Sequence, residues 1–99
     1  MTDSPEVLDN AADSRFELTI DGHVAELVYR LEGDRMVLTH TGVPDELEGQ
    51  GIGGRLVRAA VGEAEAQHLT LVPQCSFARS WLERHPDDAA RVTVEAPGA

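Results

Sequence analysis

The sequence contains no lysine, so its eight basic residues are all arginines, and they stand against eighteen acidic residues. The resulting net charge of −10 repels the phosphates of nucleic acids and the head groups of anionic lipids, which makes both poor candidate ligands. An acidic surface attracts cations, so an amine substrate would fit it. Acidity that only keeps the protein soluble explains the same charge, and composition alone does not decide between the two.

Cysteine is almost absent too: Cys75 stands alone, which excludes an internal disulfide and suits a reducing compartment. One cysteine cannot build a zinc site, and none of the four histidines stands at metal-ligand spacing from another, so we expect no metal. No apolar run approaches the roughly 20 residues that cross a bilayer. Residues 1–6 lack the basic and apolar segments of a signal peptide. We therefore expect a cytoplasmic protein.

A length of 99 residues fits one domain with a single core. Residues 1–13 carry several acidic side chains and no basic one, which predicts a disordered acidic tail. The folded domain is expected over residues 14–88. Residues 89–99 are expected to form a C-terminal tail or a short edge strand.

Alternation of apolar and polar residues predicts three strands, at 15–20, 23–31 and 35–43. Asp21-Gly22 lies between the first two and is typical of a two-residue hairpin turn. Helical spacing of apolar residues then predicts a helix over 51–67, a short strand at 69–72 and a second helix over 76–84. The predicted fold is α+β in the order β-β-β-α-β-α. The crossover helix makes the last two strands parallel, in a sheet that is otherwise antiparallel.

Four glycines lie in the six residues 49–54, immediately before the first helix. Glycine lets the backbone come close to a ligand, and the free N–H groups of a helix start attract anions. The segment therefore predicts a phosphate or pyrophosphate site, although a flexible loop without a ligand explains the same glycines.

Two familiar phosphate-binding loops fit this segment poorly. A P-loop ends in Gly-Lys-Ser/Thr, whereas Gly54 is followed by Arg55 and Leu56. The spacing Gly49-x-Gly51-x-x-Gly54 matches the dinucleotide fingerprint of the Rossmann fold, but residues 44–48 separate it from the strand. The chain is also too short for a doubly wound domain.

The stretch Val43-Pro44-Asp45-Glu46-Leu47-Glu48-Gly49-Gln50-Gly51-Ile52-Gly53-Gly54-Arg55-Leu56-Val57 resembles the acetyl-CoA loop and helix of the GNAT superfamily of N-acetyltransferases. The usual pattern of that loop is Arg/Gln-Gly-x-Gly-Ile-Gly/Ala. A subgroup of very small members, in which a His-Thr strand, a Glu-Gly-x-Gly-Ile-Gly loop and a Pro-x-Cys strand end recur, is similar to this chain at His40-Thr41, at residues 48–53 and at Pro73-x-Cys75. The resemblance covers residues 15–87.

The resemblance implies a minimal GNAT-like fold whose parallel strand pair splays apart at an acetyl-CoA site near Val72. It implies transfer of an acetyl group from acetyl-CoA to an amine on a small molecule or a protein. The alternative is a CoA-binding sensor or partner module without turnover. The chain is expected to be a monomer or a weak homodimer. The residues implied in cofactor binding are Thr41, Val43, Gly49, Gln50, Gly51, Ile52, Gly53, Gly54 and Arg55.

The sequence departs from the family pattern at two positions. Glu48 stands where Arg or Gln usually precedes the first glycine, which puts a negative charge beside the pyrophosphate. Leu82 stands where many members have a tyrosine that protonates the leaving thiolate, and the only tyrosine, Tyr29, lies in a predicted strand elsewhere.

Cys75 and His40 are the candidate catalytic residues. Cys75 precedes a helix, where a thiol has a lowered pKa, so it is a candidate acid or acetyl acceptor. Packing under the cofactor is the alternative. His40 suits a general base, and it shares strand parity with Met36 and Leu38, so we expect its side chain on their face of the sheet. A histidine with a purely structural role is the alternative.

Other side chains near the loop leave two interpretations open. Arg55 and Arg58 lie one helical turn apart, and with Arg79 they are candidates for contact with nucleotide phosphates or for ion pairs on a solvated surface. Phe77 and Trp81 are assigned to the core.

Overall fold

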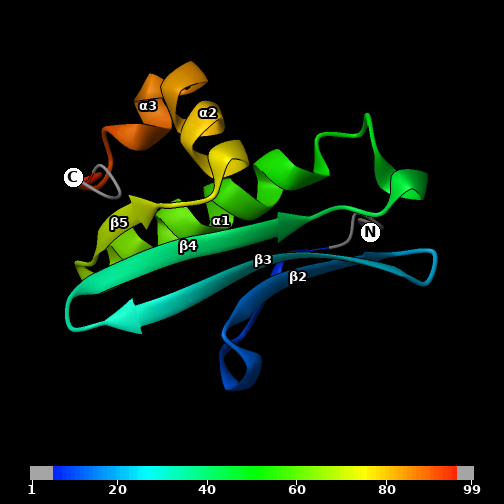
Figure 1. Cartoon of the computed structure of the whole chain (residues 1–99), viewed down its shortest axis with the longest axis horizontal. Coiled ribbons are helices and arrows are strands. Elements are labelled where there is room, and N and C mark those ends of the chain that lie inside the picture. The colour runs from blue at the N-terminus through cyan, green and yellow to red at the C-terminus, as the bar shows by residue number, and fades with distance from the viewer. Residues whose placement is uncertain (1–5, 96–99) are drawn as a thin grey trace.

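The computed structural model describes residues 6–95 and contains one five-stranded sheet with the strands in chain order (Figure 1). Strands β1 to β4 are antiparallel, and β4 and β5 are parallel. The sequence predicts this arrangement for β2 to β5, but it does not predict β1. The strands are β1 Leu8–Asn10, β2 Arg15–Ile20, β3 His23–Glu32, β4 Arg35–Gly42 and β5 Thr70–Pro73.

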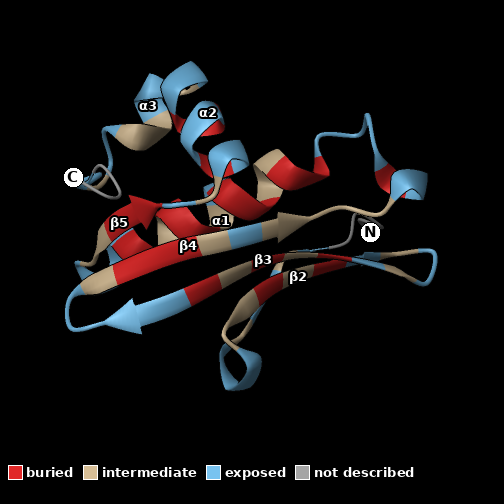
Figure 2. Ribbon diagram, viewed as in Figure 1, coloured by how far each residue is buried: buried red, intermediate tan, exposed pale blue. Residues whose placement is uncertain are grey.

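Helix α1, Ile52–Gln67, is the crossover between β4 and β5 and packs along one face of the sheet (Figure 1). Helix α2, Ser76–Arg84, lies beside the start of α1, and the single turn α3, Pro86–Ala89, follows it. The apolar side chains of α1 and the facing residues of β2 to β4 form the core, which Figure 2 shows as red bands on the sheet and helices. None of the helices within residues 6–95 is long and apolar enough to cross a bilayer.

The hairpin between β2 and β3 confirms the turn that Asp21-Gly22 predicts. Ile20 pairs directly with His23, which leaves two residues in the loop. Asp21 has φ 51° and Gly22 has φ 81°, so both occupy the left-handed region that a type I′ turn requires. This turn fixes which face of β3 meets the helix.

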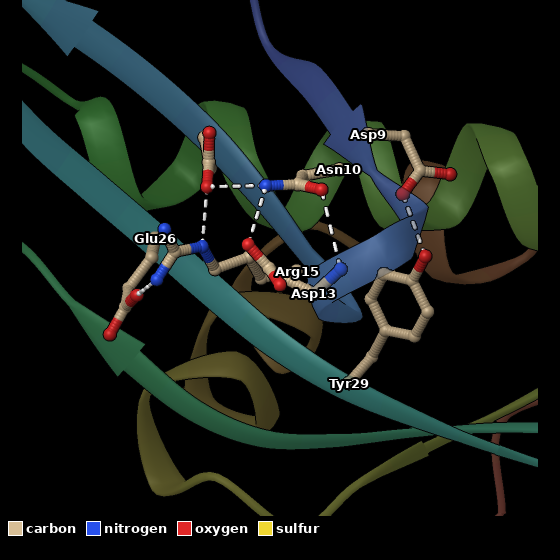
Figure 3. A network of polar contacts seen from close by, with 7 residues as sticks. Asp9, Asn10, Asp13, Arg15, Glu26 and Tyr29 are labelled. Carbon is tan, nitrogen blue, oxygen red and sulfur yellow. Dashed lines mark hydrogen bonds and ion pairs between the residues drawn. The ribbon is translucent and has the colours of Figure 1, made fainter.

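The acidic N-terminal segment differs from the prediction of disorder, since Leu8–Asn10 forms β1 and pairs with β2. The reason is a set of long-range polar contacts (Figure 3). The Tyr29 hydroxyl donates to Asp9 Oδ1 at 2.7 Å, and Asn10 Nδ2 donates to Glu17 Oε2 at 3.0 Å. Burial, followed by the Asp9 carboxylate, raises the pKa of Tyr29 to about 12. Tyr29 therefore anchors an edge strand. Residues 1–5 lie outside the described part of the chain.

The C-terminal segment runs along β5 for a short distance. Leu71 N donates to Thr93 O and Glu95 N donates to Leu71 O, both at 2.8 Å, and Val94 forms an isolated parallel bridge with Leu71. Residues 96–99 lie outside the described part of the chain.

Candidate active site

A cavity of about 720 Å³ lies over the first turns of α1, between α2 and the segment that leaves β4. Its wall is built from the end of β4, the glycine segment (residues 49–54), α1 and one side of α2. The lining residues are Thr41, Val43, Leu47, Glu48, Gly49, Gly51, Ile52, Gly53, Gly54, Arg55, Arg58, Phe77, Trp81, Arg84 and His85.

The four glycines of this wall serve two different purposes. Gly49 has φ 84° and Gly51 has φ 72°, a region that side chains with a Cβ rarely adopt, so these two shape the loop. Gly53 and Gly54 lie inside α1, where a Cβ would come within 2.6 Å of the Phe77 ring and 2.5 Å of Trp81 Nε1. These two glycines therefore allow α2 to pack closely against α1.

The start of α1 carries the features of an anion site. Gly51 is its N-cap and offers no side chain to the first amides, and the first turn contains no acidic residue. Arg55 N donates to Gly51 O at 3.2 Å, so the preceding N–H groups of residues 52–54 have no partner within the helix. The positive end of a 16-residue helix thus points into the cavity without compensation.

A slot opens where β4 and β5 separate. Their pairing ends at Leu38 and Pro73, and beyond it Gln74 N and Cys75 N both donate to Leu38 O at 3.0 Å. Strand β4 continues to Gly42 alongside β3 alone. The slot therefore lies between the end of β4 and the turn that carries Cys75 into α2.

Cys75 and Thr41 meet across this slot, with Sγ and Oγ1 3.2 Å apart. Burial raises the pKa of the Cys75 thiol. Hydrogen bonds from the Thr41 hydroxyl and from the backbone amides of Ala78, Phe77 and Thr41 lower it by a larger amount, so the pKa lies below its ordinary value. The thiol is half-buried and packs against the core. Cys75 does not line the cavity itself but is one hydrogen bond from Thr41, which does.

The predicted orientation of His40 is wrong, and a β-bulge is the cause. Val28 pairs with His40 and Tyr29 pairs with Leu38, so Thr39 is an extra residue on β4. Its hydroxyl donates to Val28 O at 3.2 Å. Beyond the bulge the alternation is reversed, and His40 lies exposed on the sheet face opposite the helix. The same bulge turns Thr41, paired with buried Leu27, toward the cavity.

His40 instead neighbours Glu26 over Gly42. A Cβ on Gly42 would stand 3.2 Å from His40 Nε2 and 3.7 Å from Glu26 Oε2. Glu26 also accepts from Arg15 Nη1 at 2.9 Å, a contact that Figure 3 displays. His40 therefore belongs to a polar cluster outside the cavity.

The structure brings together most of the residues expected to bind a cofactor. Among them, Gln50 alone does not line the cavity, although both its neighbours are glycines of the loop. Leu82 is buried in the core, and Tyr29 is bonded to Asp9, so neither supplies a proton donor to the slot. Within residues 6–95, no group of three His, Cys, Asp or Glu side chains is placed to hold a metal ion.

Sequence reasoning missed a group of cavity residues near the C-terminal end of α2, the opposite end of that helix from Cys75. Trp81 belongs to the core as expected, yet it also lines the cavity together with Arg84 and His85. A spacing of three and four residues along α2 places these side chains on one face, and this signal was available from the sequence. The expectation that Phe77 belongs to the core is wrong, because its side chain is exposed and lines the cavity.

Two comparisons with known proteins agree with this geometry. Residues 15–92 match the family described as GCN5-related N-acetyl-transferase. The fold is similar to the NMR solution structure of a GCN5-like protein from Staphylococcus aureus that is described as a candidate N-acetyltransferase. That match has a TM-score of 0.73 and 30% sequence identity, and it covers 96% of this chain and 92% of the other.

Proposed function

The chain belongs to the GCN5-related N-acetyltransferase family, and from this premise we propose that it transfers an acetyl group from acetyl-CoA to an amine. The observation that carries the proposal is the cavity itself. It joins an uncompensated helix start, suited to a pyrophosphate, to a slot that holds a perturbed thiol. A single ligand with phosphates at one end and a thioester at the other would fit both.

The residues of the cavity suit such a ligand. We assign the amides of residues 52–54 and the Arg55 side chain to the pyrophosphate, and we assign Val43 and Thr41, which also line the cavity, to the part of the ligand that leads to the slot. The adverse charge is Glu48, which is exposed at the cavity wall. The co-substrate would supply the activated acetyl group. The protein would position the co-substrate, exclude water and take up the proton that the amine loses.

We assign Cys75 to the chemistry of the slot. Its lowered pKa favours the thiolate, which carries no proton to donate. The thiolate can accept a proton from the amine, or it can attack the thioester carbonyl, which forms an S-acetyl cysteine as the CoA thiolate leaves, and the amine then takes the acetyl group from it. Thr41 is placed to donate a hydrogen bond to that thiolate. An acceptor amine that approaches from the open face of the sheet would meet His40 and Glu26 first, and only for this approach do we propose His40 as a base.

The role of the Cys75 environment is testable through its reaction with iodoacetamide as a function of pH. Because the pKa of Cys75 lies below its ordinary value, thiolate persists to lower pH than in an ordinary cysteine, so the alkylation rate should rise through a midpoint below that of free cysteine measured alongside. Thr41→Val, which keeps the shape but loses the hydroxyl, should move this midpoint upward. An unchanged midpoint in Thr41→Val would show that the hydroxyl does not act on the thiol.

Turnover is tested by the release of CoA thiol from acetyl-CoA in the presence of a panel of amines. We expect release that depends on the amine, with cationic amines favoured by the net charge of −10. Cys75→Ala should bind acetyl-CoA as the wild type does and should lose most of the release. Binding without release for any amine would favour the sensor module, and full release by Cys75→Ala would assign the cysteine to packing.

A further inference from the structure

The cavity wall near the C-terminal end of α2 is cationic, in a protein that is otherwise acidic. Arg55, Arg58 and Arg84 line the cavity, which is three of the eight arginines, whereas Glu48 is the only acidic residue between 6 and 95 that does. Arg55 lies at the glycine segment. Arg58 and Arg84 lie beyond it, one on each helix, beside His85.

Trp81 contacts two residues of this part of the wall, Arg58 and His85. Its indole is 5% exposed and stacks on the His85 ring, with centroids 3.9 Å apart and planes inclined by 13°. The Arg58 guanidinium carbon stands 5.4 Å from the centre of the Trp81 ring, within cation–π range. His85 Nδ1 is 2.8 Å from Trp81 O, which accepts, so this nitrogen carries the proton. These contacts of Trp81 therefore fix the positions of Arg58 and His85 at the cavity wall.

The two arginines differ in their existing partners. Arg58 Nε stands 3.6 Å from Asp88 Oδ2, and Asp88 also contacts Arg91, so this ion pair is long and shared. The side chain of Arg84 forms no hydrogen bond or ion pair with any other residue between 6 and 95. The helix dipole stabilises a cation in the last turn, and this alone would explain an arginine at position 84 without a ligand. It does not explain why Arg58 and His85 converge on the same cavity wall.

The cavity therefore has two separate places for an anion. Arg58 follows Gly54 by four residues, which is about 6 Å along the helix axis, and one pyrophosphate group at the helix start leaves the second place free. A ligand that fills both must carry a further phosphate. CoA does, because its nucleotide ends in a phosphomonoester with a charge of about −1.5 to −2 at neutral pH.

We propose that Arg84 and Arg58, with His85 beside them, bind the 3′-phosphate of CoA and make the site select CoA over dephospho-CoA. The inference rests on the proposed function, since it assumes that CoA occupies the cavity. It adds a specificity determinant distinct from the glycine segment.

The test compares CoA with dephospho-CoA by calorimetric titration of four proteins: the wild type, Arg84→Gln, Arg58→Gln and Arg79→Gln. The wild type should bind CoA about tenfold or more tightly than dephospho-CoA, the lower range for hydrogen bonds to charged groups. Arg84→Gln should lose most of this preference by weakening CoA alone. Arg79, on the same helix, donates to Gln74 O and does not line the cavity, so Arg79→Gln should keep the preference within about twofold.

The outcomes separate the inference from the function on which it rests. Equal affinity of the wild type for CoA and dephospho-CoA would overturn the phosphate subsite and leave the acetyl-CoA site standing. A preference that survives in both Arg84→Gln and Arg58→Gln would also overturn it. Failure of the wild type to bind either compound would overturn the subsite and the proposed function together.

Discussion

Gly51→Asp is expected to weaken acetyl-CoA binding by at least about a hundredfold and to leave the fold intact. Gly51 caps α1 with φ 72°, and a Cβ there would meet no atom within 4 Å, so the new side chain fits without displacing a neighbour. It would put a carboxylate at the place proposed for the pyrophosphate, where like charges at contact distance cost about 4 kcal/mol at an effective dielectric constant near 20. The positive φ of 72° strains any side chain at this position, and the attraction of the carboxylate to the positive end of the helix offsets part of that cost, so the melting temperature should fall only slightly.

The matched control is Gly51→Asn. Asparagine has the shape of aspartate and tolerates the left-handed region equally well, but it carries no charge. It should bind acetyl-CoA far more tightly than Gly51→Asp, as measured by calorimetry on both variants. Similar affinities for the two would mean that no anion lies near Gly51, and the assignment of the loop would be lost.

Gly54→Ala is expected to lower the free energy of unfolding by about 1–3 kcal/mol, the usual cost of overpacking. The new Cβ would stand 2.5 Å from Trp81 Nε1, and this indole is buried and held by its stack on His85. For a chain of 99 residues, each kcal/mol shifts the melting temperature by about 4–8 °C. Thermal unfolding followed by circular dichroism measures the change.

Two further glycines of α1 provide the comparison. Gly53→Ala would meet the outer end of the Phe77 ring, which is 38% exposed and able to move, so its effect should be smaller. Gly62→Ala would meet only Arg91 Nη2 at 3.7 Å and should stabilise the helix by about 0.5–1 kcal/mol. A Gly54→Ala variant as stable as Gly62→Ala would contradict the close contact between α1 and α2.

The parts of the fold that could be predicted from the sequence are those that local chemistry decides. The left-handed turn at Asp21-Gly22 and the apolar spacing of α1 require no knowledge of distant residues. Strand β1 does, because its three residues are held by Tyr29 and Glu17 from other strands. Composition alone therefore indicated disorder where tertiary hydrogen bonds produce a strand.

In the candidate site, too, the features that local sequence decides could be predicted, and those that depend on distant residues could not. The glycine segment was recognisable because positive φ and free amides are local properties. The orientation of His40 depended on one extra residue at Thr39, and alternation along a strand carries no sign of a bulge. Gly53 and Gly54 also resemble phosphate-loop glycines in the sequence, whereas their missing side chains admit Phe77 and Trp81.

The most direct test of the account is calorimetric titration of the purified protein with acetyl-CoA, beside CoA, NAD and ATP. The account predicts saturable binding of acetyl-CoA and CoA and clearly weaker binding of NAD and ATP, because only the CoA compounds match both the phosphate sites and the slot at Thr41 and Cys75. Absence of binding by both CoA compounds would contradict the assignment of the cavity, and equal binding of NAD or ATP would contradict its selectivity.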